Sequence, residues 1–249
     1  FSGSCRRSGR FVSGSVFAHE AGGQQADLAD DRITGQWFDF FSAKGYHVVK
    51  IDSRDRGKMK NVKSIIDNAC KEKKERDRKR GIINRPVRAM VAGIPNVGKS
   101  TFINSFAGKA CAQTGNKPGV TKGKQWIRLN KDVELLDTPG ILWPKFEDNT
   151  VGIRLAFIGS VNDQVINMHE LAGELVAYIT RLYPGRLNER YKADESLQIA
   201  DILRCIATSR GCLKKGGEID YDKAVSILFD DFRSGKLGKV SLESPEEYL

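Results

Sequence analysis

One eight-residue segment limits the possible folds of this 249-residue chain more than any other feature. Residues 93–100 read GIPNVGKS and fit the pattern G-x-x-x-x-G-K-[ST], in which glycines let backbone N–H groups approach phosphate oxygens. The apolar residues 87–92 before it predict a buried strand, and residues 101–107 after it predict a helix whose N-terminus favours an anion. A glycine-rich turn with a chance Lys-Ser pair would not require these flanking elements. We therefore interpret the segment as a nucleotide-binding loop, with Lys99 on the β- and γ-phosphates and the Ser100 hydroxyl on Mg²⁺.

A second phosphate-related motif is the segment LLDTPG at residues 135–140. Asp137 ends an apolar strand, where P-loop nucleotide hydrolases place the carboxylate that holds Mg²⁺ through water. Gly140 has no β-carbon between its N–H group and a γ-phosphate. The tetrapeptide DTPG alone could form a simple β-turn. Downstream of a phosphate loop it indicates a nucleotide-sensing switch, and Thr121 in the intervening segment KPGVT could supply a second Mg²⁺ hydroxyl.

Predicted strands and helices alternate over the first two thirds of the chain. Strands are expected at residues 45–51, 87–92, 125–129 and 133–136, and helices at 37–43, 60–79 and 101–107. This order predicts an α/β domain, with a mostly parallel sheet covered by helices on both faces. After residue 159 the pattern becomes helical, with helices expected at 171–182, 196–209 and 221–232. This part predicts a small all-α domain.

Positive charge is concentrated in one segment. Residues 54–88 hold 14 basic and 5 acidic residues, a net of +9, within a chain whose formal net charge is +10. Such an excess indicates a polyanion such as RNA as partner. A solvated helix face with i,i+4 ion pairs is the alternative, because acidic residues interrupt the run. We favour RNA contact, because the excess of basic residues is large.

Several classes of protein are excluded by composition. No apolar run approaches the roughly 20 residues that a membrane-spanning helix needs, so we expect no membrane association. The five cysteines are widely spaced and only three histidines are present, which does not suit a structural zinc site. Residues 1–23 lack the apolar core of a signal peptide, so a cytoplasmic location with reduced thiols is expected.

The base-recognition motif N-K-x-D is missing downstream of residue 140. The only similar segment there is YKAD at residues 191–194, which we interpret as a turn before the next helix. Upstream of the phosphate loop, the segment QQAD at residues 24–27 and the strand that ends at Asp52 and Ser53 are candidate base-binding elements. The motifs therefore follow one another in a rearranged order.

This order and five segments resemble the circularly permuted P-loop GTPases of the YlqF family, which includes ribosome biogenesis GTPase A and is related to a mitochondrial ribosome-assembly GTPase. The segments are GIPNVGKSTFINSF at 93–106, TGNKPGVTKGKQW at 114–126, ELLDTPGILWPKFED at 134–148, YPGRLNERY at 183–191 and RGCLKKGGEIDYDK at 210–223. The resemblance extends from Ala26 to the C-terminus. Residues 24 and 25 are Gln-Gln where the family has Asn-Lys, and residues 16–23 are not expected to form the strand that precedes them in the family.

The resemblance implies roles for individual residues. Phosphate binding is implied for Asn96, Val97, Gly98, Lys99, Ser100 and Thr101. Ser100 and Thr121 would ligate Mg²⁺, and Asn96 occupies the position of a K⁺ ligand in potassium-activated relatives. Asp27 would accept hydrogen bonds from guanine N1–H and N2–H₂, and Ser53 would lie beside guanine O6. The implied catalytic set comprises Lys99, Thr121, Asp137 and Gly140.

The expected organisation is an N-terminal segment at 1–23 unlike the family, a circularly permuted GTPase domain at 24–158 and a helical RNA- and ribosome-binding domain at 159–249. The expected function is GTP binding and hydrolysis during assembly of the large ribosomal subunit, slow alone and stimulated by the ribosome. Its partners would be the precursor of that subunit and its rRNA, with no DNA, and the protein would be a monomer off the ribosome. An RNA-binding scaffold with little or no GTP turnover is the alternative, and an ATPase is a third option that Asp27 argues against.

Overall fold

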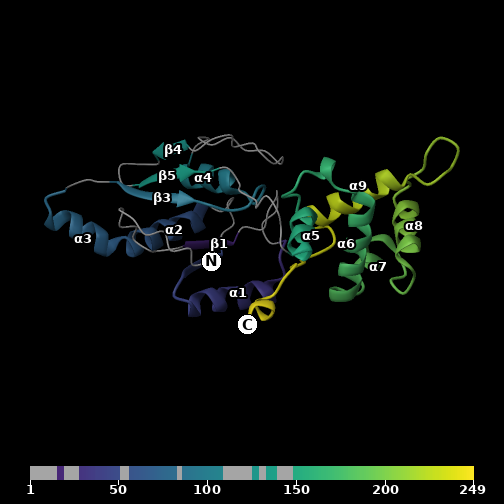
Figure 1. The fold of residues 1–249 in the computed structure, drawn as a ribbon, viewed down its shortest axis with the longest axis horizontal. Coiled ribbons are helices and arrows are strands. Elements are labelled where there is room, and N and C mark those ends of the chain that lie inside the picture. Colours follow the sequence, from purple (N-terminus) through teal and green to yellow (C-terminus); the bar gives the residue numbers. More distant parts are fainter. Residues whose placement is uncertain are drawn as a thin grey trace.

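A computed structural model describes residues 16–19, 28–50, 56–82, 86–108, 125–128, 133–138 and 148–249. The chain forms two lobes side by side along its longest axis, one built around small sheets and one of helices (Figure 1). Among the described residues, no helix combines the length and the apolar character needed to cross a membrane.

A three-stranded sheet organises the first lobe. Its strands are β3 (Val87–Val91), β5 (Val133–Asp137) and β4 (Gln125–Arg128), in the order β3-β5-β4. β3 and β5 are parallel and pair Val91 with Asp137, whereas β4 is antiparallel to β5. Since parallel strands end at the same edge of a sheet, the loop that follows β3 and the last residue of β5 lie together there.

Helix α4 (Lys99–Ala107) covers one face of this sheet. Its Ile103 is completely buried and packs with Ile127, Val133 and Leu135, whose side chains alternate with more exposed ones along their strands. This alternation with period two is typical of a strand with one face on a core. The apolar side chains of α4, β4 and β5 therefore form one layer beneath the phosphate loop.

A second, two-stranded sheet joins β1 (Val16–His19) and β2 (His47–Lys50) in parallel, and α1 (Asp31–Ala43) lies between them in the chain. The expectation that residues 16–23 contain no strand is wrong for residues 16–19. The tetrapeptide VFAH is short, but Val and Phe favour extended backbone, and pairing with β2 supplies the hydrogen bonds that a local pattern does not reveal.

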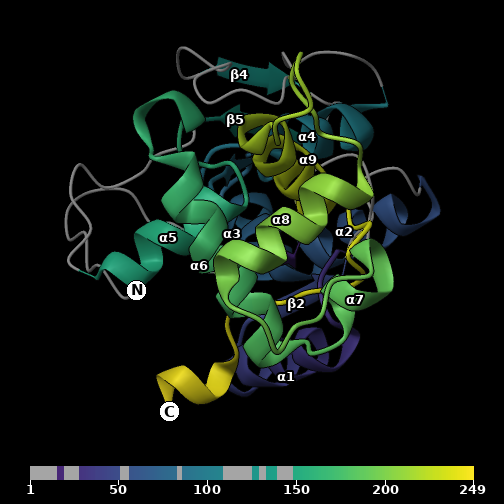
Figure 2. The same cartoon turned by 90° about the vertical axis from the view of Figure 1, so that its right-hand side faces the viewer.

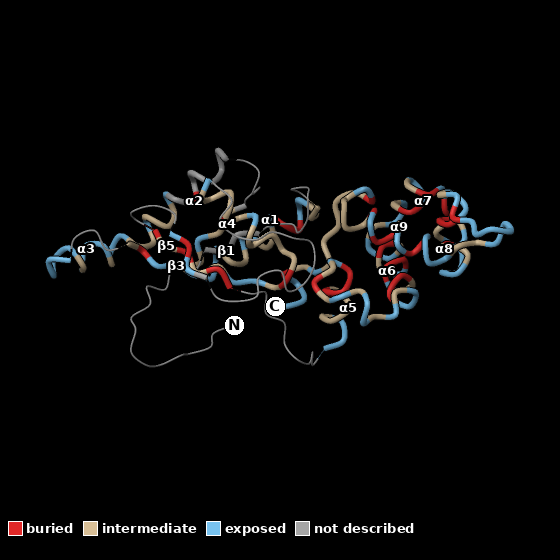
Figure 3. Tube along the Cα trace, turned by 90° about the horizontal axis from the view of Figure 1, so that it is seen from above, coloured by how far each residue is buried: buried red, intermediate tan, exposed pale blue. Residues whose placement is uncertain are grey.

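The single helix expected at residues 60–79 is two helices, α2 (Arg56–Ala69) and α3 (Lys71–Lys79), which meet at Cys70. Val62 of α2 is buried against Val49 and the Phe102 and Phe106 rings of α4. All residues of α3 are described, and none of them is buried, so this helix extends into solvent at the far end of the first lobe (Figure 3).

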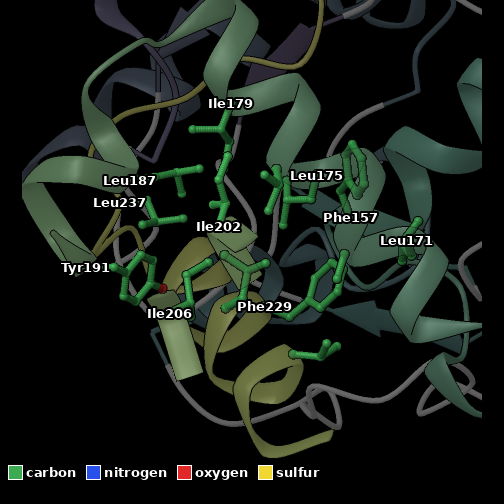
Figure 4. Close-up of a cluster of buried hydrophobic side chains, with 14 of the residues drawn as sticks. Phe157, Leu171, Leu175, Ile179, Leu187, Tyr191, Ile202, Ile206, Phe229 and Leu237 are labelled. Carbon is green, nitrogen blue, oxygen red and sulfur yellow. The ribbon is translucent and has the colours of Figure 1, made fainter. Parts of the chain in front are cut away.

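The second lobe is all-helical. It contains α5 (Asn149–Phe157), α6 (Met168–Leu182), α7 (Arg186–Tyr191), α8 (Ile199–Ser209), α9 (Tyr221–Arg233) and the short 3₁₀ helix η1 (Asp163–Val165). A second 3₁₀ helix, η2 (Pro245–Tyr248), follows this lobe in the chain and lies beside α1 (Figure 1). Leu175, Ile179, Ile206 and Leu228 are completely buried, and this core is the largest in the described chain (Figure 4). Burying each such side chain contributes about 1.5–3 kcal/mol, so this core stabilises the lobe strongly.

Candidate nucleotide-binding site

The phosphate loop connects β3 to α4. Within it Asn96 and Gly98 have positive φ angles of 60° and 86°, and Gly98 is the N-cap of α4. Glycine adopts this left-handed conformation without a steric penalty, which explains the residue type at position 98. The turn leads directly into the N-terminus of α4, where unpaired backbone N–H groups and the helix dipole favour an anion. Local geometry thus supports the assignment of residues 96–101 to phosphate binding.

Lys99 lies folded back over this loop. Its Nζ atom donates a 2.7 Å hydrogen bond to the carbonyl oxygen of Ile94. The lysine stem lies close to Gly93, where an added β-carbon would be 3.5 Å from Lys99 Cδ, an ordinary van der Waals contact. Burial lowers the pKa of the Lys99 amine, and the nearby Asp137 carboxylate counteracts this by raising it. The ammonium group is therefore held at the loop, bonded to a backbone carbonyl and near the Asp137 carboxylate.

Asp137 is the acidic group of the site. The residue is 1% exposed, and its Oδ1 atom has no hydrogen-bond partner among the described residues. Burial raises the pKa of its carboxyl, against the lowering effects of Lys99 and of the Thr138 backbone N–H. Thr138 Oγ1 donates a 2.8 Å hydrogen bond to the carbonyl oxygen of Val91, which fastens the end of β5 to the end of β3. A buried, unpartnered carboxylate oxygen beside a phosphate loop fits a site for Mg²⁺ and its water ligands.

The structure brings seven of the predicted site residues together at one edge of the sheet. These are Asn96, Val97, Gly98, Lys99, Ser100, Thr101 and Asp137. The other four, Asp27, Ser53, Thr121 and Gly140, lie outside the described residues.

The segment YKAD is structural, as interpreted from the sequence. Tyr191 is 1% exposed in the helical core, and its hydroxyl donates a 3.1 Å hydrogen bond to Asp231 Oδ2. Burial raises the pKa of this hydroxyl, so it stays protonated as a donor. The segment is not a base-recognition motif.

Two residues at the loop were missed by sequence reasoning. The Ser160 hydroxyl donates a 2.8 Å hydrogen bond to the carbonyl oxygen of Pro95, and Ser160 is 1% exposed. The carbonyl oxygen of Gly159 accepts a 2.6 Å hydrogen bond from Asn96 Nδ2. Neither residue belongs to a motif or an apolar repeat, so the sequence carries no signal for these contacts.

Comparison with known proteins identifies the family. The model of a protein family described as "50S ribosome-binding GTPase" matches residues 88–204. Ribosome biogenesis GTPase A of Bacillus cereus is 45% identical over 225 residues, which are 90% of this chain and 76% of that protein. The chain belongs to the ribosome biogenesis GTPase A family. The member from Thermotoga maritima is 32% identical over 90% of this chain and 75% of its own length.

Solved structures agree with this assignment to the ribosome biogenesis GTPase A family. A GDP-bound structure of TM YlqF superimposes with a TM-score of 0.62 at 25% identity, covering 93% of this chain and 82% of that one. A GNP-bound structure of YlqF from T. maritima superimposes with a TM-score of 0.59 at 27% identity, covering 88% and 78%. The fold class and the family resemblance predicted from the sequence are confirmed.

Proposed function

We propose that this protein binds GTP at the edge of the β3-β5-β4 sheet, hydrolyses it, and acts in assembly of the large ribosomal subunit. The observation that carries the proposal is that Lys99 lies near the buried Asp137 carboxylate, whose Oδ1 atom has no hydrogen-bond partner among the described residues, at a phosphate loop. A cation and an anion side by side suit a phosphate chain together with its metal ion. The names of the relatives support the ribosomal role.

Each of the predicted phosphate and metal ligands has a distinct task in this reaction. Backbone N–H groups of residues 96–101 would cradle the β-phosphate, and Lys99 would move from the Ile94 carbonyl to the β- and γ-phosphate oxygens. Ser100, Thr121 and, through water, Asp137 would hold Mg²⁺, which when bound neutralises charge that develops on the transferred phosphoryl group. The Asn96 side-chain oxygen is available to K⁺ while its Nδ2 atom is bonded to Gly159.

Base recognition is assigned to residues before the phosphate loop. We propose that the Asp27 carboxylate accepts the guanine N1–H and N2–H₂ hydrogen bonds, and that Ser53 lies beside O6. A buried carboxylate left unpaired by adenine penalises ATP strongly. Gly140 is the proposed γ-phosphate sensor, since its N–H group can approach that phosphate without a β-carbon.

The exposed helix α3 is the proposed contact with rRNA. Its nine residues contain six basic side chains, and every one of these nine residues is exposed or half-buried. Lys74 pairs with Asp67 at 2.7 Å, but both side chains are about two-fifths exposed, so the pair leaves most of the positive surface open to phosphates. Because assembly of a bacterial ribosome takes place in the cytoplasm, we propose that location for the protein.

The experiment that tests the proposal measures GTP hydrolysis and cosedimentation with purified large ribosomal subunits, with and without GTP. Lys99→Ala removes the phosphate ligand, and Lys44→Ala, at the exposed C-cap residue of α1, is the matched control. We expect subunit-stimulated hydrolysis and GTP-dependent cosedimentation for the wild type and for Lys44→Ala, and neither for Lys99→Ala. Equal behaviour of all three proteins, with no hydrolysis, would support the scaffold alternative and overturn the proposal.

A further inference from the structure

The turn that follows α5, at Gly159 and Ser160, holds the phosphate loop from the side of the helical lobe. The Ser160 hydroxyl donates a 2.8 Å hydrogen bond to the carbonyl oxygen of Pro95, and both residues are buried. The carbonyl oxygen of the preceding Gly159 accepts the 2.6 Å hydrogen bond from Asn96 Nδ2. Two consecutive residues of the turn thus bind two consecutive residues of the loop, and Asn96 is the first residue assigned to phosphate binding.

The shape of this turn is fixed by the end of α5. The Ser160 N–H group donates to the Leu155 carbonyl oxygen at 2.9 Å, and the Gly159 N–H group donates to the Ala156 carbonyl oxygen at 3.0 Å. Together with the φ of 71° at Gly159, these are the hydrogen bonds of a Schellman motif, in which a helix ends at one left-handed residue. The position of the Ser160 backbone is therefore set by α5.

Arg233, the last residue of α9, fastens the end of α5 within the helical lobe, which faces the viewer in Figure 2. Its Nε atom donates to the Phe157 carbonyl oxygen at 2.9 Å, and its Nη2 atom donates to the Ala156 carbonyl oxygen at 2.8 Å. The Nη1 and Nη2 atoms also donate to the two carboxylate oxygens of Asp163 at 2.7 and 2.8 Å. A cation stabilises the last carbonyls of a helix, and a planar guanidinium group can bind several acceptors at once. One side chain therefore ties α9, α5 and η1 together beside the turn.

We propose that Ser160 and Arg233 are positioning residues for the phosphate loop. Binding of a β-phosphate requires several backbone N–H groups of residues 96–101 to point toward one centre, and a loop that already has this geometry avoids the cost of ordering upon binding. Ser160 holds the loop directly, whereas Arg233 acts through the turn. The inference rests on the proposed function, and it adds a role for the helical lobe in phosphate binding.

The test compares dissociation constants for GDP and GMP, measured with Mg²⁺ by competition against a fluorescent guanine nucleotide. The two ligands share the base and the ribose, and only GDP carries the β-phosphate that the loop would bind. The preference for GDP over GMP therefore reports on the loop separately from base recognition. The test variants are Ser160→Ala, which removes the hydroxyl, and Arg233→Lys, which keeps the positive charge but loses the planar set of donors.

Two control variants change other residues of the helical lobe. Ser226→Ala removes an exposed hydroxyl that also donates to a backbone carbonyl, that of Asp222 at 3.0 Å. Asp231→Asn removes a buried carboxylate whose cation partners include Arg190 and Lys236, both outside the turn, and so destabilises the lobe at a different place. Circular dichroism verifies that each variant is folded at the temperature of the binding assay.

We expect GDP affinity to fall about 3- to 10-fold in Ser160→Ala, as for loss of one hydrogen bond, and about 2- to 3-fold in Arg233→Lys. GMP affinity should not change, so the preference for GDP over GMP should fall by the same factors, and both controls should keep the wild-type preference. An unchanged preference in Ser160→Ala, or an equal reduction in either control, would overturn the inference. An unchanged preference in Arg233→Lys would overturn the part assigned to Arg233. Absence of a GDP preference in the wild type would instead overturn the proposed phosphate site, and this inference with it.

Discussion

Asn96 Nδ2 donates a 2.6 Å hydrogen bond to the carbonyl oxygen of Gly159, which joins the phosphate loop to the turn that follows α5 in the helical lobe. The neighbouring Ser160 hydroxyl donates in the same region to the Pro95 carbonyl oxygen. Gly159 has a φ of +71°, and a β-carbon there would lie 3.3 Å from Cζ of Arg233, so glycine suits the backbone conformation and leaves room for the Arg233 guanidinium group of α9. The loop, the turn and α9 therefore form one continuous set of contacts.

This relationship predicts an order of stabilities for substitutions of Asn96. Asn96→Gly removes the hydrogen bond but tolerates the φ of 60°, whereas Asn96→Ala also places a β-carbon in a left-handed conformation without the local polar interactions of asparagine. We expect the free energy of unfolding without nucleotide to fall by about 1 kcal/mol for Asn96→Gly and about 2 kcal/mol for Asn96→Ala. Urea unfolding measures both values. Equal stability of Asn96→Ala and the wild type would show that the contact contributes nothing.

Because Lys99 is proposed to bind the phosphates, its replacement should cause a large loss of nucleotide affinity. Lys99→Met keeps the apolar stem and removes the ammonium group, and charge-assisted hydrogen bonds to a phosphate chain contribute about 2–3 kcal/mol. We expect GTP affinity to fall about 100-fold, measured by fluorescent-nucleotide titration. Lys215→Met should bind GTP like the wild type. A change of less than threefold in Lys99→Met would contradict the placement of Lys99 on the phosphates.

The buried carboxylate of Asp231 predicts how the helical lobe responds to acid. Burial alone would raise the pKa of this carboxyl, but hydrogen bonds from Arg190, Lys236 and Tyr191 outweigh it and hold the pKa below its usual value. A carboxyl whose pKa is lowered by folding stabilises the protein above its unfolded pKa and loses this contribution as the pH falls through the folded pKa. Stability of the wild type should therefore decline below about pH 4.

Asp231→Asn tests this contribution. At neutral pH it leaves Arg190, Arg210 and Lys236 without their shared anion. We expect a loss of about 2–3 kcal/mol, less than the roughly 3–5 kcal/mol of a fully buried pair, because the cations are partly exposed. The difference between variant and wild type should shrink as the pH is lowered. A difference that is constant from pH 7 to pH 3 in urea unfolding would show that titration of Asp231 does not contribute.

The charge of α3 predicts salt-dependent RNA binding. Replacing Lys73, Arg76 and Lys79 by Gln removes three positive charges from a helix in which no residue is buried, so the fold should be retained. Each lost phosphate contact reduces the slope of log affinity against log salt concentration by about 0.7–0.9. Filter binding to rRNA at several salt concentrations measures this slope. An unchanged slope would place the RNA contact elsewhere on the protein.

Much of the nucleotide site could be predicted because its signals are local. The glycine spacing of residues 93–100 needs no tertiary information, and the parallel pairing of Val91 with Asp137 brings the second motif to it. The break at Cys70 could not be predicted, because apolar spacing on α2 and charge on α3 are both compatible with one continuous helix. The contacts of Gly159 and Ser160 could not be predicted either. Gly159 makes its contact through a backbone carbonyl and Ser160 through a small hydroxyl, and such groups leave no periodic pattern in the sequence.

Competition binding tests most directly whether the edge of the β3-β5-β4 sheet is a guanine-nucleotide site. A fluorescent GTP analogue is bound in the presence of Mg²⁺ and K⁺ and displaced with unlabelled GTP or ATP. We predict that GTP displaces it at least 100-fold more effectively than ATP, as expected for a carboxylate that reads guanine. Failure of the analogue to bind, or equal displacement by ATP and GTP, would contradict guanine-nucleotide recognition at this site.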